Sequence, residues 1–86
     1  MIIVKSDTIY VPKNYNVTGT LQLVVKDRAT DEEIVFDNPD DNAFPGSSYH
    51  ILTIDAGRLE PSTEYEYTLI AKDVEKIIGR GLLRTE

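Results

Sequence analysis

The fold is decided by the stretch Leu59-Glu60-Pro61-Ser62-Thr63-Glu64-Tyr65-Glu66-Tyr67-Thr68-Leu69-Ile70-Ala71, which joins a turn to a strand. From Thr63 onward the odd positions are mostly apolar and the even positions mostly polar, the period of a strand with one buried face. Pro61 fixes its own φ and lacks an N–H, which suits a bend before a strand. Tyr65 is then placed to pack its ring inward while its hydroxyl reaches back to upstream backbone. Leu59, Pro61 and Tyr65 therefore predict a tyrosine corner; the alternative is an ordinary turn before a strand with a partly buried tyrosine.

Length and composition predict one domain, residues 1–86, with a modest core. A chain of this size buries only about 60% of its unfolded surface, so we expect function on loops or faces and not in a cleft. The chain contains no cysteine, which excludes disulfides and thiolate metal sites. Its first apolar run, which stops before Lys5, is too short for a secretion signal, and no later apolar segment is long enough to cross a membrane. We therefore expect synthesis in a cytoplasm and no membrane partner.

The charge balance argues against a nucleic-acid partner. Nine Lys and Arg residues stand against fifteen Asp and Glu residues, giving a net charge of −6. Attraction to phosphates supplies most non-specific affinity for nucleic acids, and this chain would repel them. The charges are interspersed along the sequence, so we interpret them as a solubility feature.

Short segments of apolar alternation, separated by turn signals, predict an all-β chain, because no window keeps a helical period. The first predicted strand covers 2–11 and is broken at 6–7. The others cover 19–26, 33–37, 48–55, 63–72 and 77–84. The densest run of loop formers, 38–47, predicts the longest loop. Gly79 and Gly81 predict a bulge or a close backbone approach in the last strand. This spacing predicts a two-sheet sandwich, with a small barrel as the alternative.

The sequence offers little catalytic chemistry. His50 is the only histidine, and no serine or aspartate is tied to it by sequence, so we interpret it as a structural residue. Asp37, Asp40 and Asp41 provide the oxygen ligands that calcium prefers, but they fit no EF-hand and are also typical of a solvated turn. We therefore expect no enzymatic activity, no cofactor and no metal.

The corner resembles the matching stretch of fibronectin type III domains, and the residues that carry the resemblance are Leu59, Pro61, Thr63, Tyr65 and Tyr67. Tryptophan is absent, and with it the buried indole of antibody-type domains, so the likeness is to the broader class. The resemblance implies an immunoglobulin-like or fibronectin type III-like β-sandwich of six to seven short antiparallel strands.

A second resemblance spans more of the chain. The segments 20–23, 34–36, 49–55 and 64–69, with the closing Gly-Leu-Leu-Arg of 81–84, are similar to small β-sandwich virion proteins of tailed phages infecting Bacteroidetes, including the crAss-like group. Those are auxiliary capsid or head-fibre proteins. The resemblance implies a virion location after synthesis in the host bacterial cytoplasm, major capsid or head-fibre proteins and copies of itself as partners, and no catalytic residues. The 86 residues contain no counterpart of a further fibre domain, so we expect a compact subunit and not the long fibre itself.

Two functions are consistent with these observations. The first is a non-enzymatic virion protein that decorates the capsid or anchors a head fibre. The second is an immunoglobulin-like adhesion or carbohydrate-binding module of a bacterial surface system, against which the lack of tryptophan counts. We expect partner contacts through a sheet edge and through loop aromatics, Tyr15 and Phe44. The alternative for Phe44 is a lid folded over the core edge.

Overall fold

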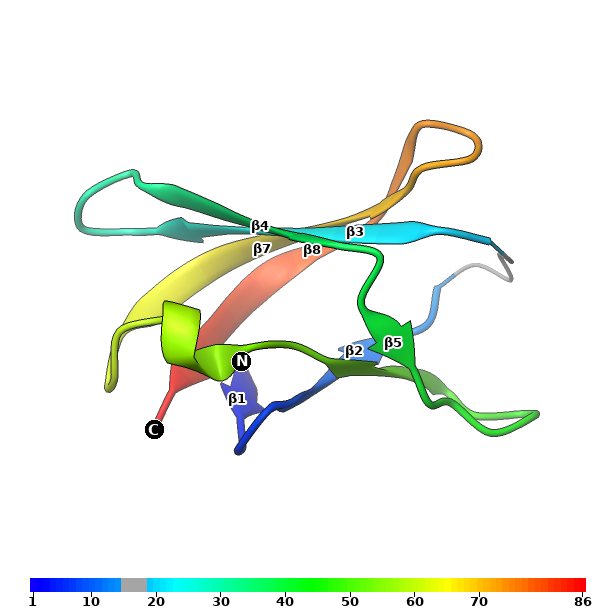
Figure 1. The fold of residues 1–86 in the computed structure, drawn as a ribbon, viewed down its shortest axis with the longest axis horizontal. Helices are drawn as coiled ribbons and strands as arrows, with labels where there is room; N and C mark the ends of the chain where they lie inside the picture. The colour runs from blue at the N-terminus through cyan, green and yellow to red at the C-terminus, as the bar shows by residue number, and fades with distance from the viewer. Residues whose placement is uncertain (15–18) are drawn as a thin grey trace.

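A computed structural model describes residues 1–14 and 19–86 of the chain (Figure 1). It is nearly all-β, with one short 3₁₀ helix and no α-helix among the described residues. The strands are β1 (Ile2–Val4), β2 (Thr8–Pro12), β3 (Leu21–Asp27), β4 (Glu33–Asp37), β5 (Asp40–Asp41), β6 (Tyr49–Thr53), β7 (Glu64–Ala71) and β8 (Lys76–Thr85), and the 3₁₀ helix η1 covers Ala56–Arg58. The predicted all-β class is confirmed.

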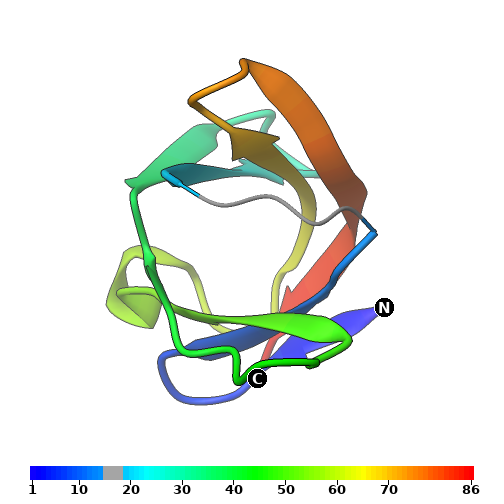
Figure 2. The same ribbon diagram turned by 90° about the vertical axis from the view of Figure 1, so that its right-hand side faces the viewer.

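The strands form two facing sheets in a small compact domain, and Figure 2 shows the interior between them. One sheet has the order β1-β8-β7-β3-β4, and the other has the order β2-β6-β5. The prediction of two sheets is confirmed. The predicted number and direction of the strands are wrong, because the described residues form eight strands and β1 runs parallel to β8.

The first predicted strand is divided between the two sheets. Ser6 has a φ of 53°, and Lys5 and Thr8 exchange backbone hydrogen bonds of 3.3 and 3.1 Å around the turn. The chain therefore leaves β1 for the opposite sheet, and β1 becomes a neighbour of β8. Parallel neighbours need a long connection, which the rest of the chain provides. A local sequence pattern predicts the interruption but not the change of sheet.

The predicted longest loop contains a short strand. Asp40 and Asp41 form β5, which pairs with Thr53 and Leu52 of β6. Two consecutive aspartates have low strand propensity, so the sequence gives no signal for a strand here. The pairing leaves a loop at 42–48 that projects from one end of the three-stranded sheet (Figure 1).

The core lies between the sheets and follows the predicted alternation. Leu21, Leu23 and Val25 of β3 point inward and are buried, as predicted, while Val24 points outward. The least exposed side chains come from both sheets and include Ile9, Val11, Leu23, Val25, Leu52, Tyr65, Leu69 and Leu83. Inward positions of both sheets thus build one hydrophobic core, and the outward positions remain for solvent or partners.

Gly79 and Gly81 lie where β8 has an irregular pairing and a close backbone approach, as the sequence predicts. Leu69 pairs with Gly79 but Ile70 pairs with Ile77, so Ile78 is an extra residue and forms a bulge. A Cβ at Gly81 would lie 3.0 Å from the Tyr67 ring, so the ring packs directly against the backbone there. The predictions of a bulge and of a close approach are both confirmed.

Candidate functional site

The predicted corner holds the start of β7. The hydroxyl of Tyr65 accepts a hydrogen bond of 2.8 Å from the backbone N–H of Glu60, and Tyr65 is 1% exposed. Leu59 belongs to the buried core, and Pro61 lies exposed at the turn. This is the geometry that defines a tyrosine corner. The corner therefore stabilises the fold, and Leu59 and Pro61 also line a hollow of about 230 Å³ beside it.

Thr85 completes the corner, and sequence reasoning missed it. Its hydroxyl donates a hydrogen bond of 2.6 Å to the carbonyl of Glu60 and accepts one of 2.9 Å from the N–H of Thr63. Thr85 is buried, so its polar group is satisfied within the protein. The contact joins residues 25 positions apart, which no local pattern indicates.

His50 is buried and paired, as expected of a structural histidine, but its partner was not predicted. Nδ1 of His50 lies 2.8 Å from Oδ2 of Asp41, and His50 is 2% exposed. Oδ1 of Asp41 accepts hydrogen bonds of 3.0 Å from the backbone N–H groups of Ala43 and Ile51. Asp41 thereby ties the 42–48 loop to β6. The signal was missed because the two residues meet only through the pairing of β5 with β6.

The environment of Asp41 also sets its charge state. Burial raises the pKa of its carboxyl group, but the hydrogen bonds from His50, Ile51 and Ala43 and the charge of His50 outweigh burial. The result is a lowered pKa. Asp41 is therefore ionised near neutral pH and able to accept all three hydrogen bonds.

The three loop carboxylates are not brought together as a cation site. Asp41 faces His50, whereas Oδ1 of Asp37 accepts a hydrogen bond of 2.7 Å from the side-chain amide of Gln22. Asp40 lies on β5 opposite Thr53. Within residues 1–14 and 19–86, no group of three or more His, Asp or Glu side chains is arranged to hold a metal ion.

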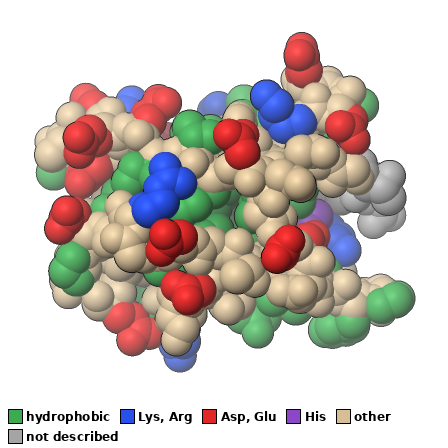
Figure 3. All heavy atoms as spheres, viewed as in Figure 1, with side chains coloured by type: hydrophobic (Ala, Val, Ile, Leu, Met, Phe, Trp, Pro, Cys, Tyr) green, Lys and Arg blue, Asp and Glu red, His purple; other side chains and the backbone are tan. Residues whose placement is uncertain are grey.

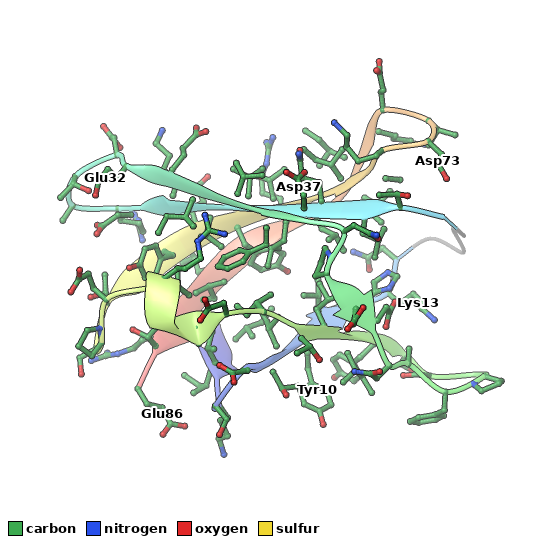
Figure 4. The ribbon with its side chains drawn as sticks, viewed as in Figure 1. Tyr10, Lys13, Glu32, Asp37, Asp73 and Glu86 are labelled. Atoms are coloured by element: carbon green, nitrogen blue, oxygen red, sulfur yellow. The ribbon has the colours of Figure 1, made fainter. Side chains whose placement is uncertain are left out.

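The strongest candidate for a functional site is an exposed aromatic surface on the outer side of the three-stranded sheet. We define this aromatic face by Tyr10 of β2, Tyr49 and Ile51 of β6, and Phe44 of the 42–48 loop. Tyr10 is 53%, Tyr49 47% and Phe44 64% exposed. Figure 4 shows Tyr10 pointing away from the five-stranded sheet, and Figure 3 shows hydrophobic side chains gathered along this side of the molecule.

These side chains enclose a shallow groove. The rings of Tyr10 and Tyr49 meet edge to face, with centroids 6.3 Å apart and planes at 75°. Their strands are in register, with Tyr10 opposite Ile51. Together with Phe44, residues 46–48 and Ile51, they line a groove of about 400 Å³. The groove is an open apolar hollow, large enough to receive an aromatic side chain.

The position of Phe44 settles one of the sequence alternatives. A lid over the core edge would be largely buried, but Phe44 is 64% exposed and lies outside the core. The lid interpretation is therefore wrong. Tyr15, the other predicted contact, lies outside the described residues. Sequence reasoning missed Tyr10, although its place between the inward Ile9 and Val11 marks it as an outward aromatic.

The aromatic face is almost free of charge. The outward positions around it are mostly uncharged, and they are Thr8, Tyr10, Pro12, Asp40, Asn42, Tyr49, Ile51 and Thr53. Of these only Asp40 carries a charge, in a chain whose residues are 28% charged. Exposed aromatics with few charges are the composition of the centre of protein interfaces.

Two of the four sheet edges, those of β4 and β2, are poorly suited to pairing. The guanidinium of Arg58 donates a hydrogen bond of 3.0 Å to the carbonyl of Val35 on β4 and lies 4.8 Å from the ring centroid of Phe36. On β2, the backbone of Thr8 is occupied by Lys5, and Pro12 has no N–H to offer. Such devices discourage strand addition. Contact through a sheet edge stays a prediction, since β1 and β5 are edge strands as well.

No helix in the described residues is long and apolar enough to cross a membrane. Comparisons with protein-family models, curated proteins and solved structures gave no match.

Proposed function

We propose that this protein is a non-enzymatic structural module with an immunoglobulin-like or fibronectin type III-like fold, and that it attaches to other proteins through the aromatic face. The strand order supports this fold type. The sheet β2-β6-β5 corresponds to strands B, E and D of an immunoglobulin-like domain, and β8-β7-β3-β4 to strands G, F, C and C′. The corner at the start of β7 stands where such domains carry their tyrosine corner.

One observation carries the proposal of attachment, namely the exposure of Tyr10, Phe44 and Tyr49 on a face with one charged residue. Large exposed aromatic groups cost solubility, and soluble proteins keep such patches small unless they serve binding. Tyrosine and phenylalanine also bury much area with few rotatable bonds, so they are efficient anchors in an interface.

The setting that we propose is the particle of a tailed phage, where the protein decorates the capsid or anchors a head fibre. The support for this setting is the resemblance of the chain to small virion proteins of Bacteroidetes phages. Its partners would be the major capsid or head-fibre proteins and other copies of itself. A small rigid sandwich with one adhesive face is suited to repeated attachment on a lattice.

The test is incorporation into particles made from the genome that encodes the chain. We expect mass spectrometry to find many copies in purified virions, and particle reconstruction to place the aromatic face against a neighbouring protein. The double variant Tyr10→Ser/Phe44→Ser should be lost from particles. Val74→Ser is the matched control, since Val74 is 65% exposed on the turn between β7 and β8. Absence of the unmodified protein from virions would refute the setting.

A second candidate is an adhesion or carbohydrate-binding module, because exposed tyrosine rings also stack on sugars. The angle of 75° between the rings of Tyr10 and Tyr49 argues against it, since the rings do not form a flat platform. Titration of the protein with bacterial surface glycans, followed by NMR, separates the two functions. Shifts confined to the aromatic face upon glycan addition would favour the second.

A further inference from the structure

We infer that a second copy of this chain is a partner of the aromatic face, in a symmetric dimer in which Phe44 of each copy enters the groove of the other. This inference rests on the proposed function only in taking the aromatic face as the contact surface. It is carried by the distribution of charge, by the shape of the face and by the state of the sheet edges.

The low charge of the aromatic face makes it a surface on which two acidic copies can meet with little repulsion. Each copy has a net charge of −6, so two copies repel over most of their surface. The aromatic face contains one carboxylate among its outward positions, that of Asp40 on the short outer strand β5. Two copies that meet at Tyr10 and Tyr49 therefore avoid placing clusters of like charges in contact. Contact here also buries three exposed aromatic side chains at once.

The shape of the face makes it self-complementary. A two-fold interface needs a projecting group and its receptor on the same surface, because each contact is then made twice. Phe44 is the most exposed of the three aromatics, and it lines the groove together with Tyr10 and Tyr49. A two-fold axis beside the groove allows each Phe44 to fill the groove of the other copy.

Two of the four edge strands, β4 and β2, are hindered from pairing with a second copy. Arg58 occupies a carbonyl of β4, and Lys5 and Pro12 limit pairing along β2. Because the groove lies on a sheet face and not at the open edges of β1 and β5, we expect the copies to stack face to face. A stable interface takes about 800 Å² from each partner, which is about one seventh of the 5379 Å² that this chain exposes. One face of so small a domain supplies a modest interface, so we expect a weak, concentration-dependent dimer.

Sedimentation analysis over a wide concentration range, roughly 10 μM to 1 mM, tests the inference. We expect a monomer–dimer equilibrium that higher salt strengthens, because salt screens the repulsion between two acidic copies. Phe44→Ser and Tyr10→Ser should each weaken the dimer by about tenfold or more, and Val74→Ser should leave it unchanged. Circular dichroism is the control for folding. We expect each variant to be folded, because the substituted side chains are exposed.

A cysteine placed in the groove gives an independent readout, since the chain has no cysteine of its own. Ser48→Cys lies beside the groove, whereas Thr30→Cys lies on the turn between β3 and β4. At high protein concentration we expect the thiol of Ser48→Cys, covered by the other copy's Phe44, to react more slowly with a thiol-specific dye, and that of Thr30→Cys to react at the same rate at every concentration.

The outcomes separate this inference from the proposed function. A protein that stays monomeric at the highest concentration, with no protection of the Ser48→Cys thiol, overturns the inference. If Tyr10→Ser/Phe44→Ser is nevertheless lost from particles, the face binds another virion protein and the proposed function stands. Conversely, a dimer that depends on Phe44, in a protein absent from virions, supports the inference and refutes the phage setting. A dimer that Phe44→Ser and Tyr10→Ser leave intact uses another surface and also overturns the inference.

Discussion

The outer faces of the two sheets differ sharply in composition. On the five-stranded sheet, outward positions carry both signs of charge, and they include Lys26, Glu33, Asp37, Glu64, Glu66, Arg80 and Arg84. Apolar side chains lie among them, and these are Ile3, Val24, Val35, Ile70, Ile77 and Leu82. Lys26 lies opposite Glu66, and Glu64 lies opposite Arg84, so unlike charges face each other across strands. On the three-stranded sheet the same kind of position carries tyrosine, threonine and isoleucine. The two faces thus differ in charge and in exposed aromatic rings, because the three-stranded sheet has one charged residue and two exposed tyrosines at these positions.

The outer face of the three-stranded sheet lacks the cross-strand pairs of unlike charge that the five-stranded sheet carries. Cross-strand pairs of unlike charge contribute only about 0.2–1 kcal/mol each, so their main consequence is a hydrated surface that resists association. Without such pairs, Tyr10 and Tyr49 gain more from a partner than from solvent. We therefore expect substitutions on the outer face of the three-stranded sheet to alter association. Equivalent substitutions on the five-stranded sheet should alter stability alone.

The largest expected effect is from Asp41→Ala, which leaves buried His50 without its partner and releases the 42–48 loop from β6. We expect a loss of about 2–3 kcal/mol in the free energy of unfolding, the cost of unsatisfied buried polar groups. Chemical denaturation measures it. Hydrogen exchange should rise most at 42–52, and in β3 and β7 it should rise only as far as the loss of global stability requires. Uniform acceleration over both sheets would show that Asp41 does not act locally.

The next effect is on the large sheet. Tyr65→Phe removes the hydroxyl that binds the N–H of Glu60, and we expect a loss of about 1 kcal/mol or more. Tyr67→Phe is the matched control, because the hydroxyl of Tyr67 makes no hydrogen bond within the described residues, and it should cost less. Urea midpoints measure both variants. Equal shifts would contradict the structural role of the corner, and neither change should affect association.

A smaller effect follows from pH. The folded state lowers the pKa of Asp41 below its ordinary value of 3.8. The unfolded state therefore takes up the proton first, so Asp41 stabilises the fold above that value, and this contribution is lost as the pH falls through the lowered folded pKa. Stability of the unmodified protein should thus fall more steeply than that of Asp41→Asn below about pH 4. Parallel acid-unfolding curves for the two proteins would contradict the assignment.

The sequence predicts those features that depend on neighbouring residues. Alternation predicts the inward side chains of β3, and the turn at Pro61 followed by Tyr65 predicts the corner, because both are local patterns. Pairing between distant segments is not local. The parallel contact of β1 with β8 and the bond between Asp41 and His50 therefore required the structure.

The aromatic face likewise combines a residue that a local pattern predicts with residues that only strand pairing brings together. Phe44 was predicted as a contact because a loop rich in Pro and Gly exposes its aromatic residue. Tyr10 and Tyr49 join it only through the register of β2 and β6, and the guarding of β4 by Arg58 depends on a contact 23 residues apart. The composition of a face can be read only after the strands have been assigned to sheets.

The central claim is that the aromatic face, and not the charged face, is the contact surface. The most direct test places the same charge on each, as Tyr10→Glu on the small sheet and Thr68→Glu on the large sheet, where Thr68 lies opposite Arg80. Sedimentation at high concentration then compares the two variants with the unmodified protein. We predict that Tyr10→Glu abolishes association and that Thr68→Glu preserves it, with both proteins folded. Association lost in Thr68→Glu but retained in Tyr10→Glu would contradict the account.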